Sequence, residues 1–155
     1  LPPDIAKKYK LVIAGKGDKD YCQYLRSLAK YPDNIIIENR FIDDDEIPMF
    51  LSGSDYSVYY YDSSEMTSGS LILSLSYGLA SICRNINGAE MITDGVNGFV
   101  FEDLIGLEDI LLNKDLRRDY DRDKVIKSVE KYDWSNSASK LLRAINLLWS
   151  QSSKK

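Results

Sequence analysis

Short runs of β-branched and aromatic residues alternate along this chain with segments of helical period, and this alternation is its strongest constraint on the fold. The runs occupy residues 10–14, 34–39, 56–61, 80–84 and 99–101. Strands that alternate with helices pair in parallel through right-handed crossovers. Uninterrupted apolar runs are typical of strands covered on both faces. The pattern therefore predicts an α/β fold with a Rossmann-like, doubly wound parallel sheet of buried strands.

Between these runs, apolar residues recur at the spacing of one helix face. The predicted helices cover residues 19–30, 43–53, 68–77, 104–113, 114–132 and 135–149, with a single turn at 89–93. Asp18 is placed to cap the first helix, and Asn97-Gly98 is a turn signal. We expect one domain over residues 1–155, with helices added after the last strand.

Composition restricts the chemistry that such a chain can perform. Its 20 basic and 24 acidic residues give a net charge of −4, which argues against nucleic-acid binding by bulk charge. Histidine is absent, which excludes His-based general acid–base catalysis and nearly all His-ligated metal sites. Cys22 and Cys83 form no CxxC motif, so we expect a reduced, cytoplasmic chain with no metal site.

The most distinctive candidate site lies where a polar loop meets the predicted fourth helix. In parallel sheets, ligands bind at the carboxyl ends of the strands, and the free N–H groups of a helix start favour an anion. Gly69 permits close approach to the backbone, and the hydroxyls of Thr67, Ser68 and Ser70 add donors. A phosphate or diphosphate fits this segment, and simple N-capping by Ser68 fits it equally well.

Three further segments carry weaker signals. Gly15-Lys16-Gly17 lacks the third glycine of a dinucleotide fingerprint and reads as a tight turn, from which Lys16 can still reach a phosphate. Glu65 reads locally as a solvated loop acid, with contact to sugar hydroxyls as the alternative. Tyr59–Tyr61 is either an aromatic stacking platform or, as is more common on a strand, part of the core.

Five stretches carry a resemblance to a known enzyme family. They are LVIAGKGD at 11–18, IIIENRFIDDDEI at 35–47, SDYSVYYY at 54–61, EMTSGSLILSLSYG at 65–78 and EMITDGVNGFV at 90–100. In order and spacing, this chain resembles the C-terminal, donor-binding half of glycosyltransferases with two Rossmann-like domains (the GT-B fold). The similarity is to the retaining family 4, the glycosyl transferases group 1.

The resemblance implies a role for each candidate residue. It places the donor sugar and the catalytic carboxylate at Glu65, and the nucleobase near Arg40 and Phe41, partly through their backbone. It places the donor diphosphate at Ser68, Gly69 and Ser70, where the helix start also predicts it. Thr67, Gly15, Lys16 and Gly17 are added to the expected diphosphate site from their local sequence. The second glutamate of the family motif falls on Leu73 and is therefore lost.

The implied reaction is metal-independent transfer, with retention, of a sugar from a nucleotide-diphosphate sugar to a glycan or lipid-linked acceptor. Surface polysaccharide biosynthesis is the expected setting, with no cofactor besides the donor.

The chain begins at Leu1 rather than Met, and we expect it to be a piece of a longer protein. The acceptor domain and an upstream Arg/Lys unit are then missing, so the piece alone is expected to be inactive. No run approaches the roughly 18 apolar residues of a membrane span, although the full protein can associate peripherally with membranes. A non-catalytic nucleotide-binding or partner-binding module is the alternative.

Overall fold

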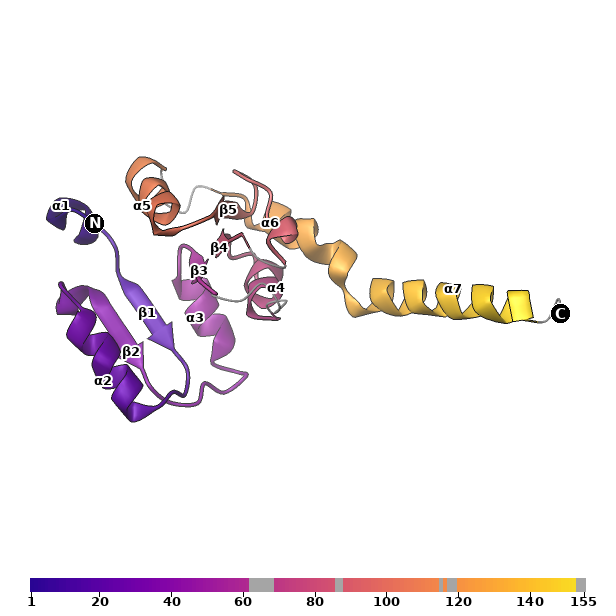
Figure 1. Ribbon diagram of the computed structural model, residues 1–155, viewed down its shortest axis with the longest axis horizontal. Coiled ribbons are helices and arrows are strands. Elements are labelled where there is room, and N and C mark those ends of the chain that lie inside the picture. Colours follow the sequence, from indigo (N-terminus) through magenta and orange to yellow (C-terminus); the bar gives the residue numbers. More distant parts are fainter. Residues whose placement is uncertain (62–68, 86–87, 115, 117–119, 153–155) are drawn as a thin grey trace.

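A computed structural model describes residues 1–61, 69–85, 88–114, 116 and 120–152. The strands are β1 (Leu11–Ala14), β2 (Ile35–Glu38), β3 (Ser57–Tyr59), β4 (Ser81–Arg84) and β5 (Gly98–Phe101). The α-helices are α1 (Pro3–Ala6), α2 (Lys19–Leu28), α3 (Ile47–Gly53), α4 (Gly69–Ser76), α5 (Leu104–Asn113), α6 (Arg122–Val129) and α7 (Trp134–Ser152). Short 3-10 helices are η1 (Pro32–Asn34), η2 (Ala89–Met91) and η3 (Glu130–Tyr132). The predicted α/β class is confirmed (Figure 1). The first four predicted strands form within their expected ranges, and β5 begins one residue earlier than expected.

The strands are all parallel, but they form two sheets instead of the single sheet that the sequence predicted. β1 pairs with β2, and β3, β4 and β5 form a second sheet with β4 in the middle. We call the segment from α1 to β2 the N-terminal unit, and β3–β5 with α4, α5 and α6 the central unit. Figure 1 shows them side by side. Within the part of the chain described, β1 and β3 each have a paired strand on one edge only.

The hydrophobic core lies in the central unit. Leu71 and Leu75 of α4 pack with Val125 of α6, and all three side chains are fully buried. On the other side of the sheet, Ile82 of β4 packs with Phe101 of β5 and with α5. Since β4 has a strand on each side and helices on both faces, it is buried as the sequence predicted.

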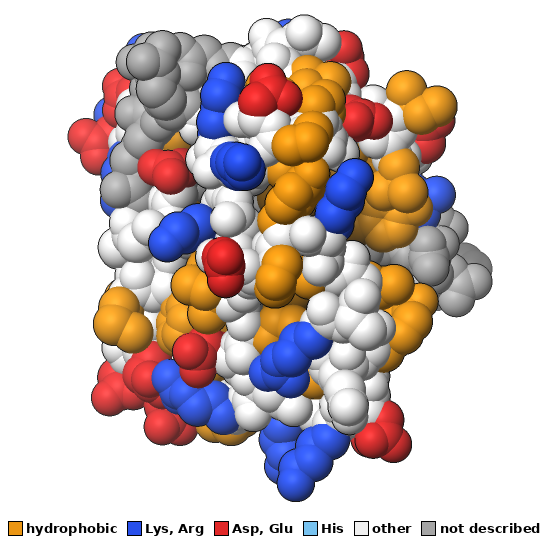
Figure 2. All heavy atoms as spheres, turned by 90° about the vertical axis from the view of Figure 1, so that its left-hand side faces the viewer, with side chains coloured by type: hydrophobic (Ala, Val, Ile, Leu, Met, Phe, Trp, Pro, Cys, Tyr) orange, Lys and Arg blue, Asp and Glu red, His pale blue; other side chains and the backbone are white. Residues whose placement is uncertain are grey.

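The N-terminal unit differs, and the prediction that its strands are buried is wrong. Leu11 and Val12 of β1 are 46% and 42% exposed, and Ile36 of β2 is 42% exposed. Cys22 of α2 is the only buried residue among residues 1–61. The physical reason is that each strand has one neighbour, so α2 is left to cover this small sheet. Figure 2, which views the molecule from this side, shows hydrophobic side chains exposed among charged ones.

A turn forms over residues 95–97, as the Asn97-Gly98 signal predicted, and it leads directly into a parallel strand. Gly98 begins β5, which runs parallel to β4. Asn97 is fully buried, where its side chain accepts a hydrogen bond from the Thr93 amide at 2.6 Å and donates to the Met91 carbonyl oxygen at 2.8 Å and to Ser128 Oγ at 2.7 Å. It therefore joins the β4–β5 crossover to α6, a long-range role that a dipeptide signal does not reveal.

The C-terminal helices agree with the prediction only in part. α5 has the predicted bounds, whereas the predicted helix 114–132 forms only as α6 and η3 within the described residues. α7 extends away from the rest of the molecule (Figure 1), and every residue from Trp134 to Trp149 is exposed. Among the described residues, no helix has the length and apolar character needed to cross a membrane.

Candidate functional site

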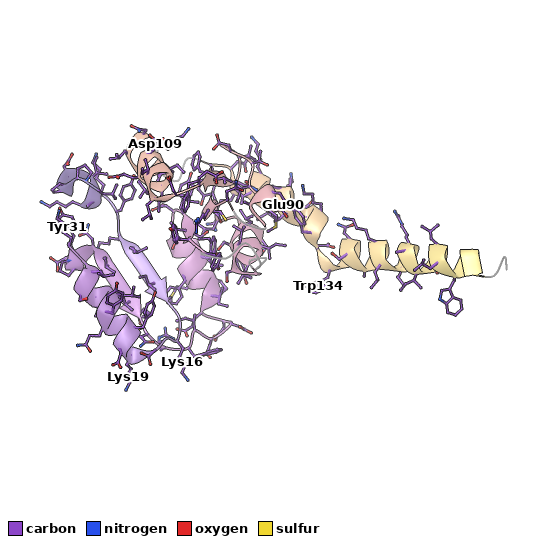
Figure 3. The ribbon with its side chains drawn as sticks, in the orientation of Figure 1. Lys16, Lys19, Tyr31, Glu90, Asp109 and Trp134 are labelled. Atoms are coloured by element: carbon purple, nitrogen blue, oxygen red, sulfur yellow. The ribbon has the colours of Figure 1, made fainter. Side chains whose placement is uncertain are left out.

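The loop after β1 is fastened to the end of β2. The Gly15 amide donates to the Glu38 carbonyl oxygen at 3.1 Å, and the Gly17 amide donates to Asn39 Oδ1 at 2.9 Å. Gly15 has a φ of +146°, which a residue with a side chain rarely adopts. These two amides are therefore already engaged, and the exposed Lys16 side chain is the group of this loop best placed to meet a phosphate. Figure 3 shows Lys16 and Lys19 together at the carboxyl end of β1, opposite Tyr31.

The loop after β2 is closed by a bidentate ion pair. Arg40 Nη1 and Nη2 each lie 2.7 Å from an oxygen of the Glu46 carboxylate, and Arg40 Nη1 also donates to the Phe41 carbonyl oxygen at 3.1 Å. The hydrogen bonds with Glu46 raise the pKa of Arg40, and those from Arg40 lower the pKa of the Glu46 carboxyl. Phe41 is 67% exposed. The sequence-assigned pair Arg40 and Phe41 thus lies at one strand end, beside the Gly15–Gly17 loop.

The start of α4 is anchored to β3. The Tyr59 hydroxyl donates to the Ser70 carbonyl oxygen at 2.7 Å and lies 2.6 Å from Ser74 Oγ. Burial raises the pKa of the Tyr59 hydroxyl further above neutral pH, so it stays a hydrogen-bond donor. A Cβ added at Gly69 would meet no atom of the described residues within 4 Å, so none of these residues covers the backbone there. Ser70 is exposed on the same first turn.

The remaining sequence-assigned residues are Glu65, Thr67 and Ser68, which lie outside the described residues. The positions of the expected catalytic carboxylate, Glu65, and of two expected diphosphate donors, Thr67 and Ser68, are therefore not described. Among the described residues, no cluster of three or more Cys, Asp or Glu side chains could hold a metal ion.

Arg84 is a candidate that the sequence reasoning passed over. It ends β4, and its guanidinium lies 5.0 Å from the ring centroid of Tyr60. Arg84 Nη1 donates to the Tyr61 carbonyl oxygen at 3.0 Å, and Nε donates to the Glu102 carbonyl oxygen at 3.2 Å. The signal available in the sequence was an arginine at the carboxyl end of a predicted central strand, where ligands of parallel sheets bind.

The three tyrosines divide between core and edge. Tyr59 packs against the core of the central unit, and its ring stacks on Tyr61 with centroids 6.0 Å apart. Tyr60 is 44% exposed and stacks on Phe101 while carrying Arg84 on its ring. The core interpretation therefore fits Tyr59, and Tyr60 serves as a platform for an arginine of the same chain.

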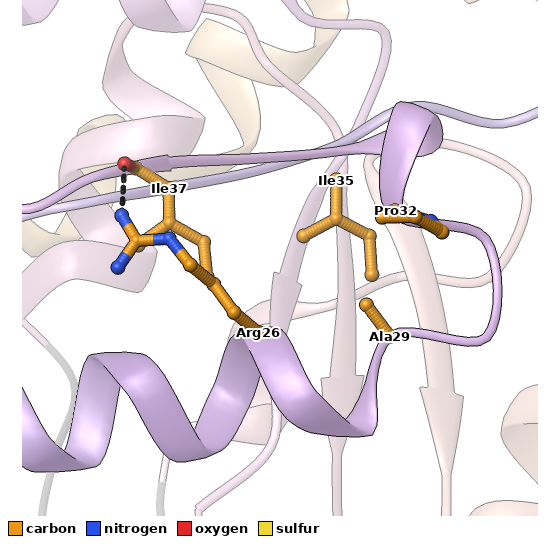
Figure 4. Close-up of a pocket in the computed structure, with 5 residues that line it drawn as sticks. All are labelled: Arg26, Ala29, Pro32, Ile35 and Ile37. Atoms are coloured by element: carbon orange, nitrogen blue, oxygen red, sulfur yellow. Dashed lines mark hydrogen bonds between the residues drawn. The ribbon is translucent and has the colours of Figure 1, made fainter.

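One hollow lies away from these loops. It has a volume of about 260 Å³ between α2 and β2 (Figure 4). Its lining residues are Arg26, Ala29, Pro32, Ile35 and Ile37. Arg26 Nη2 donates to the Ile37 carbonyl oxygen at 3.4 Å. Since this apolar hollow extends toward the amino end of β2, it does not belong to the carboxyl-end loops.

Comparison with known proteins identifies the family. A search of curated proteins returned no match to this chain. The family model described as glycosyl transferases group 1 matches residues 1–112, which include β1 to β5 and the start of α4. Because that match covers well over half of the chain, the chain belongs to the glycosyl transferases group 1.

Proposed function

We propose that residues 1–155 form the nucleotide-sugar-binding domain of a retaining, metal-independent hexosyltransferase. The enzyme transfers a sugar from a nucleotide-diphosphate sugar to a glycan or lipid-linked acceptor in cytoplasmic surface-polysaccharide assembly. Family membership establishes glycosyl transfer in general, and the donor, the stereochemistry and the acceptor are the proposed part.

The observation that carries the proposal is the open start of α4 in a member of this family. Gly69 leaves the backbone accessible, and the Tyr59 hydroxyl holds the first turn in place through Ser70. A diphosphate accepts hydrogen bonds from the free N–H groups of such a helix start. Preorganised donors and cations also stabilise a diphosphate leaving group without a metal ion, and Lys16 is an exposed cation at the carboxyl end of β1.

A second domain is part of the proposal. Acceptor binding and the upstream Arg/Lys unit belong to other parts of the enzyme, and the sheet edges support their presence. β1 and β3 each have one edge without a strand in the described part of the chain. Unpaired strand edges are typical of surfaces that pair with further polypeptide. Val12 and Val58, on the faces of these strands, are also 42% and 44% exposed.

Calorimetric titration with UDP, GDP, ADP and dTDP tests the donor assignment. Selective binding of one nucleotide supports it and identifies the base.

We expect Gly69→Val to weaken that binding at least about tenfold, because a branched side chain blocks the approach to the helix amides. The fold is expected to persist, since a Cβ at Gly69 meets open space. Gly53→Val is the matched control, because Gly53 also has open space and ends a different helix. Equal affinity of the two variants would contradict the phosphate assignment.

The alternative is a non-catalytic nucleotide-binding module, and one observation favours it. Leu73 occupies the position of the second motif glutamate, and its side chain on α4 is 38% exposed and carries no charge. Sugar release or transfer by the full-length protein separates the two functions. Tight nucleotide binding without turnover of any donor sugar would favour the module.

A further inference from the structure

The loop of residues 40–46 is held by more contacts than its exposed position requires. Besides the bidentate pair with Arg40, the Glu46 carboxylate accepts a hydrogen bond from the Asp43 amide at 3.3 Å, and the Glu46 amide donates to the Asp43 carbonyl oxygen at 2.9 Å. Arg40 Nε also lies 3.8 Å from the Glu38 carboxylate. One acidic side chain thus connects both ends of the loop and its middle.

These contacts tie the Arg40 guanidinium to its own loop. Nη1 and Nη2 donate to Glu46, Nη1 donates to the Phe41 carbonyl oxygen, and Nε faces Glu38. Three of the five N–H groups of the guanidinium therefore donate to groups of the loop itself. The Arg40 side chain therefore acts on the loop, and the exposed Phe41 ring is the group that the loop presents to solvent.

The ion pair is better suited to fixing geometry than to stabilising the fold. Both side chains are substantially exposed, at 45% for Arg40 and 29% for Glu46, and exposed pairs contribute little to stability. Bidentate arginine–carboxylate pairs, however, fix orientation well. Asn39 also holds this loop in place, because its Oδ1 accepts a hydrogen bond from the Gly17 amide. This bond joins the loop after β2 to the loop after β1.

We propose that Glu46 is the positioning residue of a nucleobase platform: through Arg40 it fixes the loop so that the Phe41 ring lies ready to stack on the base. This inference rests on the proposed nucleotide-binding function. An aromatic ring stacks on any base, so the contact contributes affinity for the nucleoside part of the donor and little choice among bases.

The test compares ligands with and without a base. Affinities of the 155-residue chain are measured for UDP, GDP, ADP, dTDP and inorganic pyrophosphate. We expect Phe41→Ala to weaken binding of the best nucleotide about tenfold, and Glu46→Gln to weaken it severalfold. Pyrophosphate affinity is expected to stay unchanged in both variants.

A structural readout keeps the test independent of affinity. Amide exchange at residues 41–45 is expected to accelerate in Glu46→Gln while the unfolding midpoint stays constant. Glu108→Gln is the control, because Glu108 is also an exposed carboxylate in an ion pair, 3.6 Å from the amino-terminal nitrogen.

Equal nucleotide affinities of wild type, Glu46→Gln and Phe41→Ala would overturn the inference while leaving nucleotide binding intact. A wild-type chain that binds pyrophosphate and all four nucleotides equally would also overturn it. Failure of the wild type to bind any of the five ligands would overturn the proposed function together with the inference.

Discussion

The N-terminal unit and the central unit are built from the same kind of sequence, yet they differ in burial. β1 reads Leu-Val-Ile-Ala and β4 reads Ser-Ile-Cys-Arg, so β1 is the more apolar strand. Ile82 of β4 is nevertheless 1% exposed, whereas Val12 of β1 is 42% exposed. The difference follows from neighbours, because β4 lies between two strands and β1 has one. Burial is thus a property of a strand's place in a sheet rather than of its composition.

The largest expected effect tests how strictly the central unit is packed. A Cβ at Gly98 would overlap the backbone carbonyl oxygen of Ser81, which neither residue can avoid without breaking the β4–β5 pairing. We therefore expect Gly98→Ala to lower the free energy of unfolding by about 4 kcal/mol, measured by urea denaturation. Gly53→Ala serves as the control and is expected to change it by less than about 0.5 kcal/mol. A loss below about 1 kcal/mol for Gly98→Ala, a quarter of the expected value, would contradict this expectation. It would mean that the β4–β5 pairing rearranges to make room for the added methyl group.

A pair of identical substitutions compares the two units directly. Ile82→Ala removes a buried side chain from β4 and is expected to cost about 3 kcal/mol. Ile36→Ala removes the same atoms from β2, where the side chain is 42% exposed, and is expected to cost about 1 kcal/mol. Urea denaturation of both variants measures the difference. Equal costs would show that other polypeptide, such as a second copy, covers the N-terminal unit in solution.

An effect smaller than those of Gly98→Ala and Ile82→Ala is expected from the pH dependence that burial in β4 creates. Burial raises the pKa of the Cys83 thiol to about 11. Between the ordinary thiol pKa of 9.0 and this value, the unfolded chain loses the proton first. The free energy of unfolding therefore falls by about 2 kcal/mol as the pH rises from 9 to 11.

Cys83→Ala isolates this contribution. The variant is expected to be less stable at every pH because of the cavity, but its stability should fall less steeply between pH 9 and 11. Thermal unfolding of both proteins across that range measures the two slopes. Parallel slopes would show that the thiol ionises equally well in the folded chain.

Several local features of the fold could be predicted because they depend on nearby residues. Asp18 caps α2 by accepting hydrogen bonds from the Asp20 and Tyr21 amides, as its place before the helix indicated. Gly78 follows the end of α4 with a φ of +73°, the conformation that glycine favours at this position. Caps of this kind lie within a few residues of the helix that they end, so the sequence contains all the information needed.

The candidate site was only partly accessible from the sequence. The carboxyl-end rule located the loops after β1 and β2 and the start of α4. It did not reveal that Asn39 Oδ1 accepts a hydrogen bond from the Gly17 amide or that Glu46 forms an ion pair with Arg40. The sequence predicted Glu46 only as an acidic residue in the first turn of a helix. Its ion pair with Arg40 depends on the path of the backbone between β2 and α3, which local sequence does not specify.

By itself, the sequence determined the order of strands and helices, their approximate bounds and the family resemblance. Each of these follows from local periodicity or from motifs read in order. The tertiary structure decided that the strands form two sheets, that β1 is exposed while β4 is buried, and that Asn97 joins the β4–β5 crossover to α6. These outcomes depend on which surfaces meet across long stretches of chain, and a local pattern of apolar residues does not specify its partner.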